Sequence, residues 1–353
     1  MRHHLAAVET PVLRERRREL AEKIVDLHYQ RQPSPWKAMG PEGREKSVRD
    51  ADYHLAYLEE AVAADDPALF SEYLAWVKVL FAGLRFPESA LRVTLETTRQ
   101  VLDENLPPAE RTAPLRMLDT GLASMERAPS SLPSLVQGES PLDLLARRYL
   151  DTLLGADRRT ASQLIMDAVE RGTSIRDIYK QVFERSQREV GRLWQMNQIS
   201  VAQEHFCTAA TQMIMSQLYP YIFKGARKDH SLVVACVGGE LHEIGARMVA
   251  DLFELDGWDS TFLGANTPTE GIVAMVKDRR TEVVAISATM TFNIPHVVDI
   301  MRALREKVSH PLQILVGGYA FNLSPALWEK IGADGYASDA ETAIRAAERL
   351  VVA

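Results

Sequence analysis

The distribution of proline constrains the fold of this chain more than any other feature. Six of the 17 prolines lie between residues 107 and 141, and no other follows until Pro220. Proline removes a helix hydrogen bond and clashes with the preceding turn, so the proline-free stretch between these points is free to form long helices. Its apolar residues recur at helical spacing. We therefore expect a helical domain over 142–223, preceded by a proline-rich linker over 107–141.

The segments on either side of this region differ in periodicity. Residues 1–106 contain long amphipathic stretches, and Asp66-Pro67 and Phe86-Pro87 have the form of helix starts, which predicts an all-α domain. Over 231–353, short β-branched runs alternate with helical segments, as is typical of a doubly wound parallel α/β sheet. The predicted strands are 232–237, 260–263, 283–287, 314–316 and 335–337.

The composition excludes several classes of protein. The formal net charge is -7, so no global attraction draws the chain to nucleic acid or to an anionic membrane. Two cysteines, Cys207 and Cys236, are too few for a disulfide framework or a thiolate metal cluster. The sequence has no apolar run of about 18 residues, and its first residues are unlike the apolar core of a leader peptide. We therefore expect a cytoplasmic protein.

Polar and glycine-rich residues follow three of the predicted strands. They are Glu240, His242 and Gly245 after the first, Ser287 and Thr289 after the third, and Gly317 and Gly318 after the fourth. In open α/β sheets, ligands bind beyond the carboxyl ends of the strands, at the point where the strand order reverses. Glycines let the backbone approach a ligand closely, and small hydroxyl side chains leave room for it. These loops predict a slot for an extended ligand.

The spacing of these residues carries a family resemblance. Glu240-Leu241-His242-Glu243-Ile244-Gly245, then Ser287-Ala288-Thr289, then Gly317-Gly318 resembles the cobalamin-binding signature D-x-H-x-x-G…S-x-L…G-G. The resemblance implies that His242 is the lower axial ligand of cobalt, with the nucleotide tail of the cofactor in the slot between Ser287 and Gly317-Gly318. Glu240 stands where the family has Asp, and Thr289 where it has Leu, so the carboxylate that should orient His242 is open to question. The alternative is a solvent-exposed loop histidine.

A second motif lies in the helical domain. Asn197-Gln198 interrupts the apolar period and Ser200 has the character of an N-cap, so Trp194 should end one helix while Glu204 and His205 project from the next. A flat indole wall with two polar anchors is suited to a nucleoside. The alternative is that the tryptophan lies in a core and that Glu-His is only a charged helix start.

The W-x9-E-H pattern resembles the light sensors typified by the adenosylcobalamin-dependent repressors of carotenoid genes. The resemblance implies that Trp194 and Val201 lie against the adenosyl group and that Glu204 and His205 hold it. Light would then break the cobalt–carbon bond and shift the helical cap against the sheet domain. Gln195 stands where these repressors have a histidine that binds cobalt after illumination. The upper ligand after light is therefore open, with water and His205 as alternatives.

The N-terminal region does not resemble the DNA-binding domain of those repressors. Its 52–80 segment resembles non-haem globin-like sensor domains, and the whole chain resembles the photocobilins, which pair adenosylcobalamin with biliverdin. Candidate contacts for such a bilin are Arg44, Arg49, Tyr53 and His54. The sequence has no cysteine before Cys207, so a bilin in this domain would be held non-covalently. Haem bound through His28 or His54 is a competing possibility.

The leading hypothesis is therefore a cobalamin-dependent light sensor, and not an enzyme. It has three domains: a globin-like domain, a four-helix-bundle cap and a flavodoxin-like or Rossmann-like sheet. Since no output domain follows the sheet, we expect the signal to pass to a separate partner or to a homo-oligomer, a dimer or tetramer that assembles in response to light. The alternative is a corrinoid carrier subunit of a methyltransferase system. A third possibility is a module that has kept the fold and lost the ligand.

Overall fold

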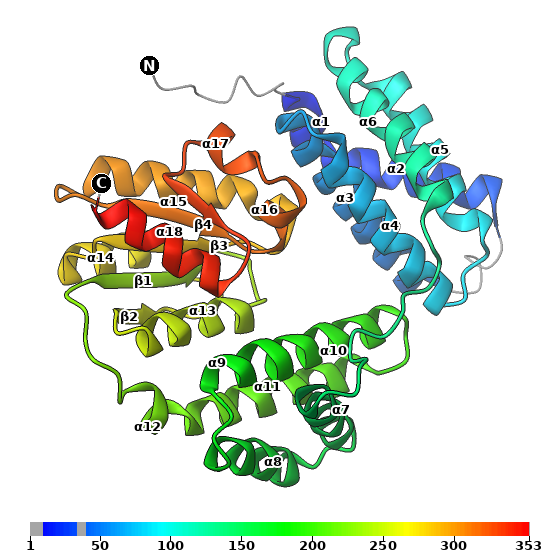
Figure 1. Ribbon diagram of the computed structural model, residues 1–353. Coiled ribbons are helices and arrows are strands. Elements are labelled where there is room, and N and C mark those ends of the chain that lie inside the picture. The colour runs from blue at the N-terminus through cyan, green and yellow to red at the C-terminus, as the bar shows by residue number, and fades with distance from the viewer. Residues whose placement is uncertain (1–9, 34–39, 353) are drawn as a thin grey trace. The chain divides into compact units, whose positions relative to one another are not determined.

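The computed structural model of the chain describes residues 10–33 and 40–352 (Figure 1). These residues form two compact units, which we describe one at a time. The first comprises Met1–Ser131 and two short later segments, Met290–Pro295 and Ala320–Gly332. The second comprises Leu132–Thr289, His296–Tyr319 and Ala333–Ala353. The first nine residues, on which the argument against a leader peptide partly depends, lie outside the described residues.

The N-terminal part of the first unit is helical, as predicted. Its helices are α1 (Pro11–Glu15), α2 (Arg17–Arg31), α3 (Gly40–Ala63), α4 (Pro67–Gly83), α5 (Ser89–Asn105) and α6 (Pro108–Arg127). Asp66 caps α4, because its carboxylate accepts a hydrogen bond from the amide of Ala68 at 2.9 Å and Pro67 takes the first helical position. The later segments add the short helices η3 (Thr291–Asn293) and α17 (Leu327–Ile331).

Helix α6 lies where the proline-rich linker was expected. Pro107 and Pro108 stand at the helix start, where the missing amide hydrogen costs little, so these prolines begin a helix rather than prevent one. Gly121 lets α6 approach α4 closely, since a Cβ there would lie 2.7 Å from the Leu74 side chain. Lys78 of α4 donates hydrogen bonds to carbonyls at the carboxyl end of α6. The connector is therefore shorter than the predicted 107–141.

A buried histidine lies inside this first unit. The Nδ1 atom of His54 lies 2.7 Å from the hydroxyl of Tyr73, and both side chains are buried. Burial, with a smaller contribution from the charge of His28, lowers the pKa of His54 to about 4. His54 is therefore neutral in the folded protein at pH 7.

This pKa predicts an acid-sensitive stability. Between pH 7 and pH 4 the unfolded chain takes up a full proton on His54, whereas the folded chain takes it up only in part near pH 4, so the free energy of unfolding should fall by about 3 kcal/mol. In a His54→Gln variant this contribution is absent, whereas all other titrating groups are unchanged. Urea unfolding of both proteins across this pH range measures the difference, and equal pH dependence in both would contradict it.

The second unit begins with the helical cap. Its helices are α7 (Pro141–Leu154), α8 (Arg158–Glu170), α9 (Ile175–Asp177), η2 (Ile178–Glu184), α10 (Arg185–Gln195), α11 (Val201–Gln217) and α12 (Tyr219–Ile222). Since α9, η2 and α10 are continuous, the long helices of the cap are four in number, as expected for a bundle. Ser200 caps α11 as predicted: its hydroxyl accepts from the amide of Gln203, whose side chain accepts from the amide of Ser200.

The five predicted strands are confirmed and form one parallel sheet. They are β1 (Ser231–Cys236), β2 (Asp259–Phe262), β3 (Val283–Ser287), β4 (Gln313–Gly317) and β5 (Gly335–Ala337). Their order is β2-β1-β3-β4-β5, the doubly wound order of flavodoxin-like proteins. Helices α13 (Ile244–Leu255) and α18 (Ala340–Val352) cover one face, while α14 (Thr269–Arg279) and α15 (Ile294–Lys307) cover the other (Figure 1).

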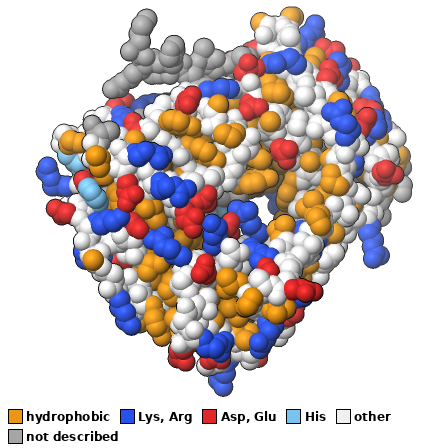
Figure 2. Space-filling view, in the orientation of Figure 1, with side chains coloured by type: hydrophobic (Ala, Val, Ile, Leu, Met, Phe, Trp, Pro, Cys, Tyr) orange, Lys and Arg blue, Asp and Glu red, His pale blue; other side chains and the backbone are white. Residues whose placement is uncertain are grey.

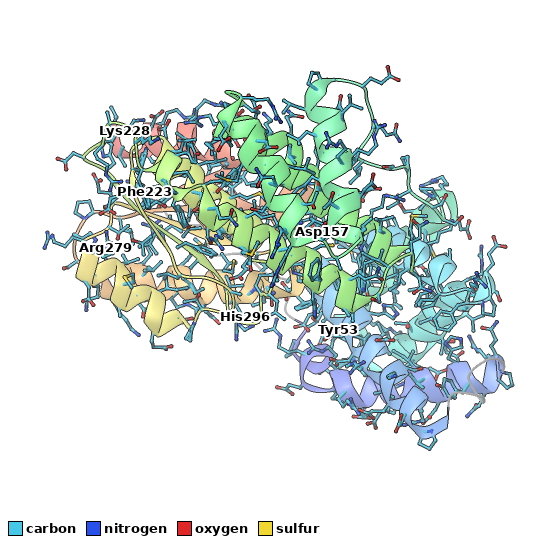
Figure 3. The ribbon with its side chains drawn as sticks, turned by 90° about the horizontal axis from the view of Figure 1, so that it is seen from below. Tyr53, Asp157, Phe223, Lys228, Arg279 and His296 are labelled. Carbon is cyan, nitrogen blue, oxygen red and sulfur yellow. The ribbon has the colours of Figure 1, made fainter. Side chains whose placement is uncertain are left out.

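The cap is fastened to α13 of the sheet domain. Arg247 donates a hydrogen bond to Ser216 at 2.7 Å. The buried carboxylate of Asp251 accepts from the hydroxyls of Tyr179 at 2.7 Å and Tyr219 at 3.0 Å. The cap helices accordingly lie against the sheet domain in Figures 1 and 3. One apolar core, which includes Phe183 of the cap and Phe253 of α13, extends across both.

The surface carries charges of both signs. Lys and Arg side chains are interspersed with Asp and Glu over the face seen in Figure 2. In the part of the chain that the structure describes, every helix is too short or too polar to cross a lipid bilayer.

Candidate functional site

The fold brings the predicted motif residues to one edge of the sheet. Strands β1 and β3 are neighbours in the sheet, and the strand order reverses between them. Ser287 ends β3 between Cys236 of β1 and Gly317 of β4, to which it is paired in register. The loops after β1, β3 and β4 therefore begin side by side. This is the position at which parallel α/β sheets bind their ligands.

A buried carboxylate joins two of these loops. The Glu240 side chain is fully buried, and its Oε1 atom lies 2.5 Å from His242 Nδ1 and accepts from the His242 amide at 3.0 Å. Its Oε2 atom accepts from the amide of Thr289, in the loop after β3, at 2.8 Å. The longer glutamate therefore reaches the histidine, which the sequence had left open. Thr289 takes part through its backbone, so the hydroxyl at this position is not required.

His242 is oriented for a metal by this contact. Its side chain is 60% exposed, whereas the Glu240 that holds it is buried. Hydrogen bonding to Glu240 raises the pKa of His242, and the charges of Glu240 and Glu204 add to this effect while burial opposes it. Because Nδ1 faces the carboxylate, Nε2 is the nitrogen available to a ligand, and the carboxylate makes it a stronger donor.

The glycine pair brings the loops after β3 and β4 together. Gly318 has a φ of 96°, and a Cβ there would lie 2.4 Å from the carbonyl oxygen of Ala288. The Ala288 amide donates to the carbonyl of Gly317 at 3.1 Å. Only glycine allows this approach at position 318. Since Ser287 and Gly317 are paired in adjacent strands, a slot for the nucleotide tail would have to lie beyond them, between the loops. At Gly245, in contrast, no atom lies within 4 Å of the position that a Cβ would take.

The cap presents a polar pair from the first turns of α11. Glu204 is partly covered, with 29% of its side chain exposed, and its Oε2 atom lies 3.5 Å from Nε2 of the exposed His205. The charge of Glu204 is the smallest of the causes that raise the pKa of His242. Trp194 is half-buried near the end of α10, whereas the neighbouring Gln195 is buried.

Two exposed apolar side chains accompany these polar groups. Val201 of the cap is 54% exposed, and Leu241, between Glu240 and His242, is 74% exposed. Large apolar side chains left open beside polar anchors are typical of a surface that contacts a ligand. Val201 belongs to the predicted site, whereas Leu241 was expected only to separate Glu240 from His242 in the motif. The sequence feature that could have identified Leu241 is the presence of an apolar residue in an otherwise polar loop.

The sequence also contains no indication of a contact between the cap and the loop after β1. Glu243 follows His242, and its Oε1 atom accepts a hydrogen bond from Gln212 of α11 at 2.7 Å. Its Oε2 atom accepts from the amide of Ala265, in the loop after β2, at 2.8 Å. The histidine loop is therefore tied to the cap and to the neighbouring loop. Partners from two elements that lie far from Glu243 in the sequence leave no local pattern by which to predict the contact.

The four candidate bilin contacts have different surroundings in the first unit. Arg44 forms an ion pair with Asp26 at 2.6 Å, and Arg49 is exposed. Tyr53, labelled in Figure 3, is 45% exposed, and its ring stacks on Phe292 at 5.8 Å between centroids. His54 is buried against Tyr73. All four lie on α3, but they are not gathered around one point.

The donor set fits a corrinoid better than a metal ion held by protein ligands alone. Across residues 10–33 and 40–352, no group of three or more His, Cys, Asp and Glu side chains is placed to hold a metal ion. A corrin ring supplies four nitrogen ligands of its own and needs only one axial donor from the protein. The oriented, exposed imidazole of His242 is such a donor.

Comparison with known protein families supports this cofactor. Residues 230–346 match the B12 binding domain family, and residues 145–219 match a second B12 binding domain family. The two matches cover the sheet domain and most of the cap. The chain therefore contains a cobalamin-binding region formed by these two parts.

Several curated relatives are corrinoid proteins. A corrinoid protein of Desulfitobacterium hafniense is 25% identical over 60% of this chain and 98% of its own length. Trimethylamine corrinoid protein 1 of Methanosarcina acetivorans is 27% identical over 56% of this chain and 93% of its own length. The solved monomethylamine corrinoid protein of Methanosarcina barkeri has a TM-score of 0.52 at 22% identity, over 60% of this chain and 99% of its own, and shares the fold.

Proposed function

We propose that this protein carries a cobalamin with His242 as the lower axial ligand and works through the group held on the opposite, upper face. The observation that carries this proposal is the His242–Glu240–Thr289 network at the switch point of the sheet. A bound corrinoid supplies a cobalt atom whose upper carbon ligand is transferable or releasable. The protein itself orients the lower ligand through Glu240 and covers the upper face with the cap.

The comparisons favour a corrinoid carrier of a methyltransferase system over the light sensor that the W-x9-E-H pattern suggests. The relatives named above are corrinoid proteins, two of them of methylamine systems, and they match this chain over nearly their whole length. In this role the protein has no catalytic centre of its own. The cap and the loops would present the cofactor to a separate methyltransferase.

A light sensor that binds adenosylcobalamin remains the second candidate, because one observation favours it. Glu204 and His205 form a polar pair near the exposed Val201 on the first turns of α11, and a methyl group cannot form hydrogen bonds with such a pair. The relatives also leave about two fifths of this chain unmatched. In this candidate the first unit is a globin-like sensor that holds biliverdin non-covalently, and the signal is a change in domain packing or in a homo-oligomer.

One experiment separates the two candidates. The full chain is loaded in the dark with methylcobalamin or adenosylcobalamin, desalted, and passed over a sizing column before and after green light. Equal retention of the two cofactors, with an elution volume that light does not change, supports the carrier. Preferential retention of adenosylcobalamin and a light-dependent elution volume support the sensor. Loss of both cofactors on desalting would overturn cobalamin binding itself.

The bilin has an independent test. Biliverdin is added to the full chain in the dark and the mixture is desalted. A red-shifted absorption band that stays with the protein supports the bilin proposal, and a band that leaves with the small molecules contradicts it. A His54→Gln variant examines whether this buried side chain takes part.

A further inference from the structure

We propose that Gln187 and Thr208 are positioning residues that aim the Glu204 carboxylate at a hydroxyl-bearing group on the upper face of cobalt. This inference rests on the proposed cobalamin binding and, within it, on the second candidate, in which the cofactor is adenosylcobalamin. It assigns a role to a hydrogen-bonded chain inside the cap that neither motif contains.

The chain of hydrogen bonds runs from the core of the cap to Glu204. Tyr149 of α7 and Thr211 of α11 are buried, and their hydroxyl oxygens lie 2.8 Å apart. The side-chain amide of Gln187, on α10, donates to the Thr211 hydroxyl at 2.8 Å. The Thr208 hydroxyl lies 3.3 Å from the Gln187 amide oxygen and donates to Glu204 Oε1 at 2.9 Å. Three helices of the cap therefore determine the position of one carboxylate.

Every donor along these hydrogen bonds, from Tyr149 to Glu204, can be matched to an acceptor. Each hydroxyl has one proton, and Thr208 faces two acceptors, Glu204 and the oxygen of Gln187. If the Gln187 amide turns by 180°, its nitrogen donates to Thr208 and its oxygen accepts from Thr211. Every proton from Tyr149 onward then points toward Glu204, and the chain ends on the only carboxylate in it. Aligned hydrogen bonds strengthen one another, which favours this arrangement.

Glu204 is not needed as a helix cap. Ser200 and Gln203 already form a reciprocal capping box at the start of α11. A glutamate in the first turn would ordinarily be mobile and solvated, at a cost in entropy whenever a ligand orders it. Here the Thr208 bond holds Oε1, while Oε2 lies on the side of the exposed His205. A carboxylate that is already ordered loses less conformational entropy when the ligand binds.

The chemistry of this oxygen selects the ligand class. A carboxylate accepts hydrogen bonds, so it favours an upper group that carries hydroxyl donors, such as the ribose of a nucleoside. A methyl group donates no hydrogen bond and gains nothing from the alignment. The hydrogen bonds from Tyr149 to Glu204, which we call the Glu204 relay, should therefore favour adenosylcobalamin over methylcobalamin. They should not affect the ligand on the lower face of cobalt.

Position 208 offers a matched pair of variants. Thr208→Val keeps the shape of the side chain and removes the hydroxyl, whereas Thr208→Ser keeps the hydroxyl. The dissociation constants of adenosylcobalamin and methylcobalamin are measured in the dark on the full chain, by following the corrinoid spectrum. We expect the preference for adenosylcobalamin to fall by at least about tenfold in Thr208→Val and to be retained in Thr208→Ser, because a hydrogen bond to a charged group contributes at least that factor to an equilibrium constant.

The outcomes distinguish the relay from the proposed function. If Thr208→Val and Gln187→Leu both keep the preference for adenosylcobalamin over methylcobalamin, the role of the Glu204 relay is contradicted. This conclusion requires that both variants have melting temperatures close to that of the unsubstituted protein. A weaker affinity for both cofactors by the same factor would point to a structural role and also contradict it. If the unsubstituted protein binds the two cofactors equally, the ligand class is wrong although cobalamin binding stands. If it binds neither, the proposed function fails.

Discussion

Replacing His242 with Ala should remove the nitrogen ligand below the cobalt and weaken cobalamin binding by about 100-fold or more. Loss of an outer partner of a metal ligand typically costs 10- to 100-fold in affinity, and loss of the ligand itself should cost at least as much. The visible spectrum of bound cobalamin should change to that of a form without a protein ligand. Absorption spectroscopy of the loaded, desalted protein measures both effects.

A matched histidine provides the control for this experiment. His310 lies in the loop before β4, at the opposite edge of the sheet, where its Nε2 atom contacts the Thr281 carbonyl at 3.0 Å. His310→Ala should leave the cobalamin spectrum unchanged. If His242→Ala gives the spectrum of the unsubstituted protein, His242 is not the axial ligand, and the exposed loop histidine of the alternative interpretation is correct.

Replacing Gly318 with Ala should destabilise the second unit by about 4 kcal/mol. The new Cβ would lie 2.4 Å from the Ala288 carbonyl oxygen, and the residue would remain at a φ of 96°. A strained backbone conformation costs about 1–3 kcal/mol and overpacking adds about 1–3 kcal/mol. Urea unfolding of the full chain without added cofactor measures this loss separately from ligand binding.

A helical glycine gives the comparison for Gly318. Gly271, on α14, has nothing within 4 Å of its Cβ position and no positive φ. Gly271→Ala should be neutral or stabilising by up to about 1 kcal/mol, since alanine favours a helix interior. A loss below about 1 kcal/mol in Gly318→Ala would show that the loops after β3 and β4 separate easily, contrary to the close contact described here.

Local patterns in the sequence predicted much of the fold. β-branched runs identified the central strands β1, β3 and β4, because residues in a parallel sheet buried on both faces are apolar over short stretches. Ser200 and Asp66 identified helix starts, since capping depends on residues within one turn. The proline rule failed at α6, where Pro107 and Pro108 begin a helix. Proline position within a helix matters more than proline number.

The sequence by itself determined the alternating strands and helices, the helix caps and the types of residue at the carboxyl edge of the sheet. These depend on neighbours within a few positions along the chain. Only the tertiary structure decided that Glu240 reaches both His242 and Thr289, that Gln195 is buried, and that Gln187 connects Tyr149 to Glu204 through Thr211 and Thr208. Apart from the Glu240–His242 pair, these contacts depend on residues that lie far apart in the sequence, such as Glu240 and Thr289. Their geometry depends on how helices and strands pack, which no local pattern encodes.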